Sequence, residues 1–132
     1  MILVDTSVWI DYFSRSPGPA GRELHRLIFN REPLALTGVV ATEVLQGLAR
    51  EVQQVEAFLL LFDLIEPNGW ETYFAAAALH RLARTRGLTL STVDAFIAAL
   101  AIEVRAALFS LDRDFVRLAS ITGLQVYPLK AE

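Results

Sequence analysis

Short apolar runs alternate with longer helical segments along almost the whole chain of 132 residues. This alternation leaves few folds open, because short strands separated by helices form a parallel sheet that is covered on both faces. The expected strands are residues 2–4, 34–36, 64–65, 107–109 and 125–127. Helices are expected over about residues 8–13, 22–30, 39–50, 52–62, 70–86 and 91–104, with one more from Asp112. The sequence therefore predicts an α/β fold.

The chain has the length of one domain and more apolar residues than one domain needs. A length of 132 residues falls in the usual range of about 100 to 150 for a single domain. The only linker-like stretch, residues 14–21, holds Pro17, Gly18 and Pro19; it is expected to be a surface turn, too short to divide the chain. We therefore expect a single domain over residues 1–132. The hydrophobic fraction of 54% exceeds the roughly 45–50% of typical soluble chains and suggests an interface with a partner.

Cysteine content, charge and hydropathy exclude several classes of protein. With no cysteine, disulfides and thiolate metal sites are excluded, and a cytoplasmic location is the simplest expectation. The net charge of −3 argues against a broadly basic surface for nucleic acids, so any contact with RNA must be local. The longest apolar stretch, Phe96 to Ile102, is far shorter than the roughly 18 residues of a membrane span. It predicts a buried helix, and no membrane partner is expected.

Acidic residues are expected at one edge of the predicted sheet. Asp5 directly follows the first strand and Asp112 the fourth, while Asp94 lies in the first turn of the helix before the fourth strand. Glu43 lies inside the helix that follows the second strand. In parallel sheets, ligands bind beyond the carboxyl ends of the strands, where the following loops meet. The positions of these acids therefore indicate a candidate site at that edge.

Each acid also has an explanation that involves no catalysis. Asp5 and Asp112 occupy positions where a carboxylate caps the N-terminus of a helix, an interaction of about 0.5–2 kcal/mol. Asp94 follows Ser91 by three residues, as in a capping box. Glu43 is a helical glutamate, and such residues face solvent by default.

The surroundings of two acids weaken these explanations. Asp94 is the only charged residue between Arg86 and Glu103, in a helix that is apolar on all sides and is expected to be largely buried. A charge in such a place needs a partner. Glu43 has no basic residue three or four positions away that would form a salt bridge within the helix.

A divalent cation would stabilise carboxylates that converge. Two carboxylates about 4 Å apart repel each other by about 4 kcal/mol at an effective dielectric of about 20. Oxygen ligands without cysteine or histidine select hard ions, so Mg²⁺ is expected, with Mn²⁺ as a substitute. A bound metal ion lowers the pKa of water and polarises a phosphoryl oxygen, which is the chemistry of phosphodiester hydrolysis.

Acidic motifs in separate segments of the chain resemble those of VapC-type PIN-domain proteins. The segments are residues 2–11 (ILVDTSVWID), 42–47 (TEVLQG), 94–101 (DAFIAALA) and 109–115 (FSLDRDF). They occur in the order found in that family and span nearly the whole chain, so together they are far more specific than any one of them. Ser110 stands where the family often has threonine, which preserves the hydroxyl group.

The resemblance implies both a fold and an activity. The implied fold is the PIN-like domain, a three-layer α/β/α sandwich with a five-stranded parallel sheet. The implied activity is metal-dependent endonucleolytic cleavage of single-stranded RNA by Asp5, Glu43, Asp94 and Asp112. Asp5, Asp94 and Asp112 are the expected Mg²⁺ ligands. Glu43 is expected to position or deprotonate the attacking water.

Partners and supporting residues follow from the same resemblance. It implies the toxin of a type II toxin-antitoxin system, which forms a homodimer and is neutralised by a cognate VapB-like antitoxin. Asp114 matches the fourth motif as a support residue. Ser7 and Ser110 are expected to form hydrogen bonds with carboxylates or phosphate.

Two other functions stay open at the level of the sequence. A phosphotransfer or receiver-type domain, or another metal-dependent phosphohydrolase, also gathers acids at strand ends. A receiver-type domain needs a lysine near the pocket, however, and the only lysine is Lys130 near the C-terminus. A non-catalytic PIN-fold binding module is the second alternative, although such a module is expected to have lost some of the acids.

Several conspicuous side chains are expected to have structural roles. His25 and His80 have no second histidine or cysteine at the spacing of metal ligands. Arg15, Arg22 and Arg26 flank the proline-rich turn and are expected to form a solvated face rather than a guide for RNA. Aromatic residues at helical spacings are expected to pack in the core or in a dimer: Trp9, Tyr12, Phe13, Phe58, Phe62 and Phe74.

Overall fold

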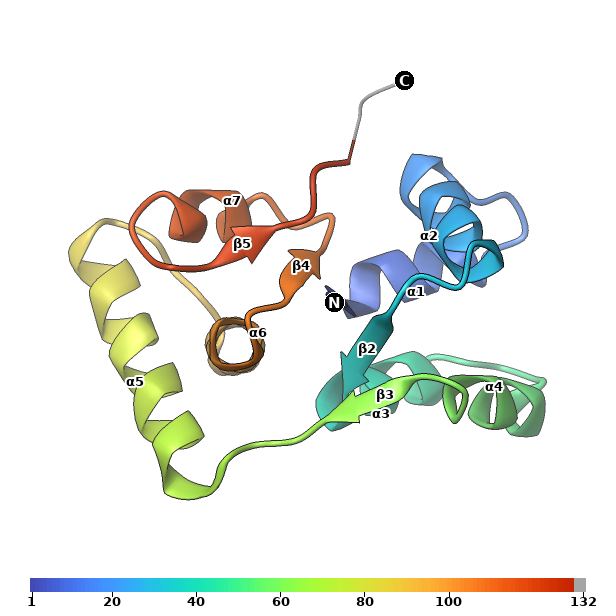
Figure 1. The fold of residues 1–132 in the computed structure, drawn as a ribbon, viewed down its shortest axis with the longest axis horizontal. Coiled ribbons are helices and arrows are strands. Elements are labelled where there is room, and N and C mark those ends of the chain that lie inside the picture. The colour runs from blue at the N-terminus through green and yellow to red at the C-terminus, as the bar shows by residue number, and fades with distance from the viewer. Residues whose placement is uncertain (130–132) are drawn as a thin grey trace.

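Five short strands form one parallel sheet in the order β3-β2-β1-β4-β5 (Figure 1). The strands are β1 (Ile2–Val4), β2 (Leu34–Thr37), β3 (Asp63–Ile65), β4 (Ala107–Phe109) and β5 (Gln125–Val126). These features come from a computed structural model of the chain, which describes residues 1–129. Every apolar run that predicted a strand forms one, so the predicted α/β fold with a parallel sheet is confirmed.

The order of the strands reverses at β1. From β1 the chain adds β2 and then β3 on one side, and it later returns to add β4 and β5 on the other side. β1 consequently pairs with both β2 and β4, and Leu3 lies opposite Ala35 and Leu108. A sheet with such a reversal has a crevice at the carboxyl ends of the two strands that meet there. In this protein those strands are β1 and β4.

Helices cover both faces of the sheet. They are α1 (Thr6–Tyr12), α2 (Pro19–Phe29), α3 (Gly38–Gln46), α4 (Val52–Leu59), α5 (Gly69–Thr85), α6 (Thr92–Val104) and α7 (Asp114–Ala119). Figure 1 shows α5 and α6 together on one side of the sheet and α1 with α2 on the other. The predicted three-layer α/β/α sandwich is therefore confirmed.

The apolar helix α6 packs between β4 and α5. Its buried residues are Ala95, Ile97, Ala98, Ala99, Leu100 and Ala101, as the apolar sequence predicts. The buried hydroxyl of Thr72 on α5 donates a hydrogen bond to the Glu103 carboxylate of α6 at 2.9 Å and so fastens the two helices together. No helix within residues 1–129 is both long enough and apolar enough to cross a membrane.

An aromatic cluster joins α1 to α4 around Trp9, which is completely buried. The rings packed around it belong to Tyr12, Phe13, Phe58 and Phe62. The predicted packing role of these residues is confirmed. Phe74 differs from them, since its side chain is 64% exposed and stacks on Trp70 at the surface of α5.

The proline-rich turn is shorter than predicted. α2 already begins at Pro19, so the turn predicted over residues 14–21 ends at Gly18. Proline is well suited to the first position of a helix because its missing N–H has no helical partner there. The Asp11 carboxylate holds the turn by accepting the N–H groups of Gly18 and Gly21 at 2.9 and 2.7 Å.

Candidate catalytic site

Asp5 lies at the reversal of the sheet, between the end of β1 and the start of α1. Its backbone N–H donates to the Phe109 carbonyl at 2.9 Å, which fixes it against the end of β4. Its buried carboxylate does not cap α1. Instead, Oδ2 accepts hydrogen bonds from the hydroxyls of Ser110 at 2.7 Å and Ser7 at 3.3 Å. The explanation of Asp5 as a side-chain helix cap is therefore wrong.

Ser7 and Ser110 join the start of α1 to the loop after β4. The Ser7 hydroxyl accepts the N–H of Leu111 at 3.0 Å, and the Ser110 hydroxyl accepts the N–H of Asp112 at 3.1 Å. Both serines also donate to Asp5, so their predicted hydrogen bonds with a carboxylate are confirmed. Because these bonds fasten the loop after β4 to the start of α1, they hold Asp112 near Asp5.

Glu43 is held by a residue that the sequence did not single out. Thr6, at the first position of α1, donates its hydroxyl hydrogen bond to Glu43 Oε1 at 2.8 Å. The Glu43 side chain on α3 is half-buried, so the explanation as a solvated helical glutamate is wrong. The only signal for Thr6 in the sequence was its hydroxyl group directly beside Asp5.

Asp94 lies in the first turn of α6 with its side chain half-buried. The helix is largely buried, as predicted, but Asp94 lies at its end rather than in its middle. The Ser91 hydroxyl accepts the Asp94 N–H at 3.0 Å and so caps α6. The capping explanation is therefore correct for Ser91, and it does not account for the charge on the Asp94 carboxylate.

Asp112 is exposed in the loop between β4 and α7. Its Oδ1 accepts the N–H of Asp114 at 2.9 Å, so the carboxylate shapes the turn that precedes α7. The predicted start of the helix at Asp112 is wrong, since α7 begins at Asp114. Asp114 itself forms an ion pair with Arg117 at 2.8 Å. Its contacts are those of a residue that supports the loop.

Burial and the charges of neighbouring acids affect the ionisation of Asp5 and Asp94. The pKa of Asp5 is raised, chiefly by burial, and the charge of Glu43 raises it further despite opposing hydrogen bonds. The pKa of Asp94 is also raised, first by burial and then by the charges of Asp112, Asp5 and Glu43. The structure thus brings all of the predicted site residues into one region of negative charge, at the crevice between β1 and β4.

The donor atoms of this region fit a hard divalent cation. Within residues 1–129, no three Asp, Glu or His side chains stand close enough to hold an ion jointly as they are placed. Mg²⁺ does not require such a cluster, because it commonly binds through one or two carboxylates and keeps several waters. The donors are oxygen atoms alone, and a cation would relieve the repulsion between them. Lys130, which a receiver-type domain would need at its pocket, lies outside the described residues.

Comparison with known proteins gives the family. A profile of the PIN domain matches residues 2–121, a range that contains every acid of the candidate site. The chain belongs to the PIN-domain family. This PIN domain is 35% identical over 129 residues to VapC ribonuclease Mb1587 of Mycobacterium bovis, and the alignment covers 95% of the chain and 96% of that relative. The resemblance to VapC-type PIN-domain proteins is therefore confirmed.

Solved structures share the fold of this PIN domain. A toxin-antitoxin complex from Klebsiella pneumoniae contains a chain that matches with a TM-score of 0.72 and 25% identity, covering 94% of this chain and 95% of that one. VapBC2 from Rickettsia felis, bound to a DNA fragment from its promoter, contains a chain that matches with a TM-score of 0.74 and 21% identity, covering 96% and 98%. PIN-domain ribonucleases are metal-dependent enzymes.

Proposed function

We propose that this chain is an endoribonuclease toxin that hydrolyses RNA phosphodiester bonds with the carboxylates of Asp5, Glu43, Asp94 and Asp112. The observation that carries the proposal is that these side chains gather at the reversal of the sheet, where Thr6 binds Glu43 and Ser110 binds Asp5. Burial first, and then the charges of the other acids, raise the pKa of Asp94 there. Helix caps also lie at this edge of a parallel sheet, but the side chains of Asp5, Glu43 and Asp94 cap no helix. The similarity to VapC ribonucleases supports RNA as the substrate.

Asp5, Asp94 and Asp112 are the proposed ligands of Mg²⁺, with Mn²⁺ as a substitute. When bound, the ion supplies an activated water and stabilises the negative charge that develops on the phosphate. The serine hydroxyls hold Asp5 in one orientation before an ion arrives. Because the ligand is already ordered, ion binding costs less conformational entropy.

Glu43 is proposed to act on the attacking water. Its carboxylate accepts a proton from the water while the oxygen attacks phosphorus and the bond from phosphorus to the leaving oxygen breaks. The hydrogen bond from Thr6 engages Oε1, and Oε2 has no hydrogen-bond donor among the described residues. Thr6 therefore orients Glu43 while leaving its second oxygen available for water.

A VapB-like antitoxin is the proposed partner of the toxin. Support comes from the toxin-antitoxin complex of Klebsiella pneumoniae, which contains a chain similar to this one over nearly its whole length. Coexpression with the antitoxin encoded beside this chain is expected to suppress growth inhibition and to give a complex that purifies intact. Growth inhibition that is insensitive to every neighbouring small protein would contradict this part of the proposal.

The toxin is further proposed to be a cytoplasmic homodimer, with each copy acting as a single domain over residues 1–132. Exposed aromatic side chains on α5 support an interface, since Trp70 is 75% and Phe74 is 64% exposed. Light scattering at several protein concentrations tests the dimer. A monomer at all concentrations would show that the proposed assembly is wrong.

The enzymatic proposal is tested by incubating the purified protein with single-stranded RNAs. New RNA ends are expected in Mg²⁺ buffer, EDTA is expected to stop the reaction, and Mn²⁺ is expected to restore it. Asp5→Asn should be inactive, whereas Asp63→Asn, which alters an exposed acid on the edge strand β3, should cleave normally. Cleavage that continues in EDTA would contradict a metal-dependent site. RNA binding without cleavage would instead indicate a non-catalytic module.

A further inference from the structure

A groove of about 640 Å³ runs between α5 and α6. Val93 and Ala95, the neighbours of Asp94 in the chain, both line it. Val39 lines it from α3, the helix that carries Glu43. The groove therefore adjoins two of the helices on which the proposed catalytic acids lie. Its volume falls within the roughly 300–1,000 Å³ of pockets that bind small ligands.

Exposed arginines form the charged part of the groove. Arg81 and Arg84 both line it, and neither has an ion pair or a side-chain hydrogen bond within residues 1–129. Residues 72–93 contain three arginines and no Asp or Glu, in a chain whose net charge is −3. The groove therefore concentrates positive charge next to the acidic site. This is the kind of local contact that an acidic chain needs if it is to hold phosphates.

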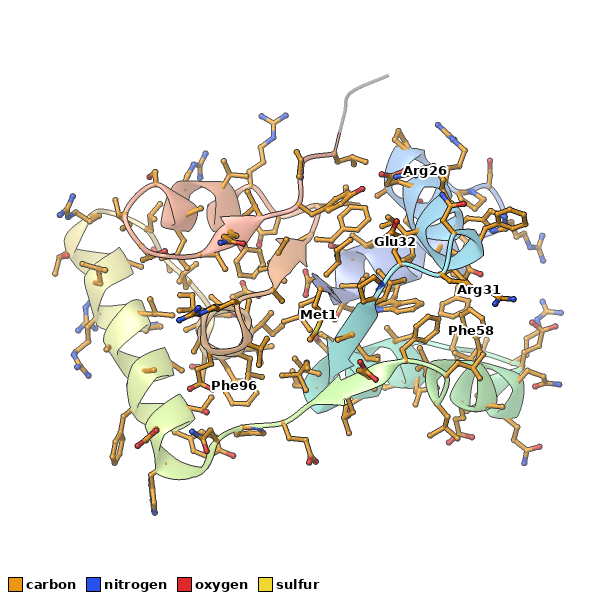
Figure 2. The ribbon with its side chains drawn as sticks, in the orientation of Figure 1. Met1, Arg26, Arg31, Glu32, Phe58 and Phe96 are labelled. Atoms are coloured by element: carbon orange, nitrogen blue, oxygen red, sulfur yellow. The ribbon has the colours of Figure 1, made fainter. Side chains whose placement is uncertain are left out.

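An aromatic pair forms the apolar part of the groove. The Tyr73 ring on α5 stacks on the Phe96 ring of α6, with centroids 5.7 Å apart and an angle of 17° between the planes. Figure 2 shows Phe96 leaving α6 on the side away from β4 and β5. Tyr73 remains 52% exposed, so part of its ring is open to a ligand. Aromatic rings of this kind stack on nucleic-acid bases, and such bases are accessible only where the strand is unpaired.

We propose that this groove binds a single-stranded segment of RNA next to the phosphodiester that is cleaved. Phosphates lie at Arg81 and Arg84, and a base stacks on Tyr73. The inference rests on the proposed ribonuclease function and adds to it the path of the substrate.

A second groove, between α1, α2 and α4, is less suited to this role. Its Arg22 already donates a hydrogen bond to the Pro17 carbonyl at 2.8 Å. It is also lined by Tyr12 and Phe13, at the opposite end of α1 from Asp5. The groove beside Asp94 combines free cationic groups with proximity to the acids.

The charged part of the groove is tested by the double substitution Arg81→Gln with Arg84→Gln. Arg15→Gln with Arg50→Gln is the matched control, because it removes the same charge from exposed positions elsewhere. Binding of a fluorescent single-stranded RNA is measured by anisotropy in EDTA at several salt concentrations. Each phosphate contact contributes about 0.7 to the slope of log affinity against log salt, so the groove variant should lose about 1.4 from the slope and about tenfold in affinity. The control variant should keep the wild-type slope.

The aromatic part is tested by Tyr73→Leu, with Phe29→Leu as the control at an exposed aromatic residue on α2. Loss of a stacked base should weaken binding by about fivefold or more, with little change in the salt slope. An RNA duplex of the same sequence should bind more weakly than the single strand. Equal binding of duplex and single strand would overturn the proposed stacking.

The outcomes separate the groove from the enzymatic proposal. Suppose that the wild type cleaves RNA while Arg81→Gln with Arg84→Gln binds it with unchanged affinity and salt slope. The proposed binding of RNA in the groove is then wrong, and the ribonuclease proposal stands. If the wild type binds with the expected slope but does not cleave in Mg²⁺ or Mn²⁺, the enzymatic proposal alone fails. If the groove substitutions convert a dimer into a monomer, a second copy of the chain occupies the groove and the inference is overturned.

Discussion

The acidic site and the groove between α5 and α6 adjoin each other, but they are built differently. Asp5 is buried and is held by serine hydroxyls, one of which comes from 105 residues further along the chain. Arg81 and Arg84 are exposed and have no side-chain partner in the described part of the chain. Fixed carboxylates suit a reaction that tolerates little misplacement, whereas unconstrained arginines suit a flexible strand of varied sequence. We therefore expect the acids to govern kcat and the groove to govern KM.

The largest expected effect comes from removing one carboxylate. Asp5→Asn or Asp94→Asn should lower kcat by about a thousandfold and abolish growth inhibition, because the site loses charge that stabilises the reacting state. RNA binding in EDTA and the circular dichroism spectrum should be unchanged, since the groove and the fold are intact. Full activity in either variant would show that the assignment of the acids is wrong.

A smaller effect is expected when Glu43 keeps its charge but loses its hydrogen bond. Thr6→Val removes the hydroxyl at nearly constant volume and should lower kcat by about tenfold at unchanged KM, because Glu43 is then free to leave its position. Thr6→Ser retains the hydroxyl and should recover most of the rate. The affinity for Mn²⁺, measured by electron paramagnetic resonance, should be the same in all three proteins. A similar loss in Thr6→Ser would indicate that Thr6 contributes through packing instead.

Combining substitutions from the two regions tests whether they act independently. Thr6→Val together with Arg81→Gln and Arg84→Gln should lower kcat/KM by the product of the separate effects, to within about twofold, because residues that share no contact partner add to within about 0.3–0.5 kcal/mol. Steady-state cleavage of one RNA substrate provides the measurement. A combined loss much smaller than the product would show that binding in the groove also orients the scissile phosphate.

The smallest expected effect concerns stability without a metal ion. Burial raises the pKa of Asp5 above its ordinary value of 3.8, so the folded protein binds this proton more tightly than the unfolded chain does. The contribution of Asp5 to stability is therefore present at low pH and is lost as the pH rises from about 3.8 through the raised pKa. In EDTA at pH 7, Asp5→Asn should raise Tm by about 2–4 °C, a typical response to about 1 kcal/mol.

Calorimetry with and without Mg²⁺ checks this prediction. The ion should raise Tm in the wild type and have much less effect in Asp5→Asn, because the wild-type carboxylate is a proposed ligand. A lower Tm for Asp5→Asn in EDTA would mean that the serine hydrogen bonds stabilise the charged carboxylate by more than its burial costs. In that case the burial of Asp5 would not destabilise the folded protein at pH 7.

Local patterns were sufficient to predict the strands and the acids. Asp5 follows an apolar run and Asp112 follows another, so their places at strand ends were readable without any tertiary information. Errors arose where a local signal has two meanings. Pro19 fits a turn as well as the first position of α2, where it lies, and the apolar neighbours of Asp94 do not reveal where the end of the helix points.

Contacts between distant residues lay beyond the reach of the sequence. The hydrogen bond from Thr6 to Glu43 joins residues 37 positions apart, and the one from Leu111 to Ser7 joins residues 104 positions apart. A hydroxyl group forms such bonds with whichever acceptor the fold presents, so its residue type alone does not identify the partner. The groove arginines were missed for the same reason, since nothing local showed that α5 would pack on α6.

By itself, the sequence determined the α/β class and the identity of the acids, because hydrophobic periodicity and short motifs are local properties of the chain. Only the tertiary structure decided that β1 lies between β2 and β4, which places Asp5 beside the loop of Asp112. It also decided that Arg81 and Arg84 line a groove next to Asp94. Strand order and helix packing depend on which apolar surfaces bury one another, and that choice involves the whole chain at once.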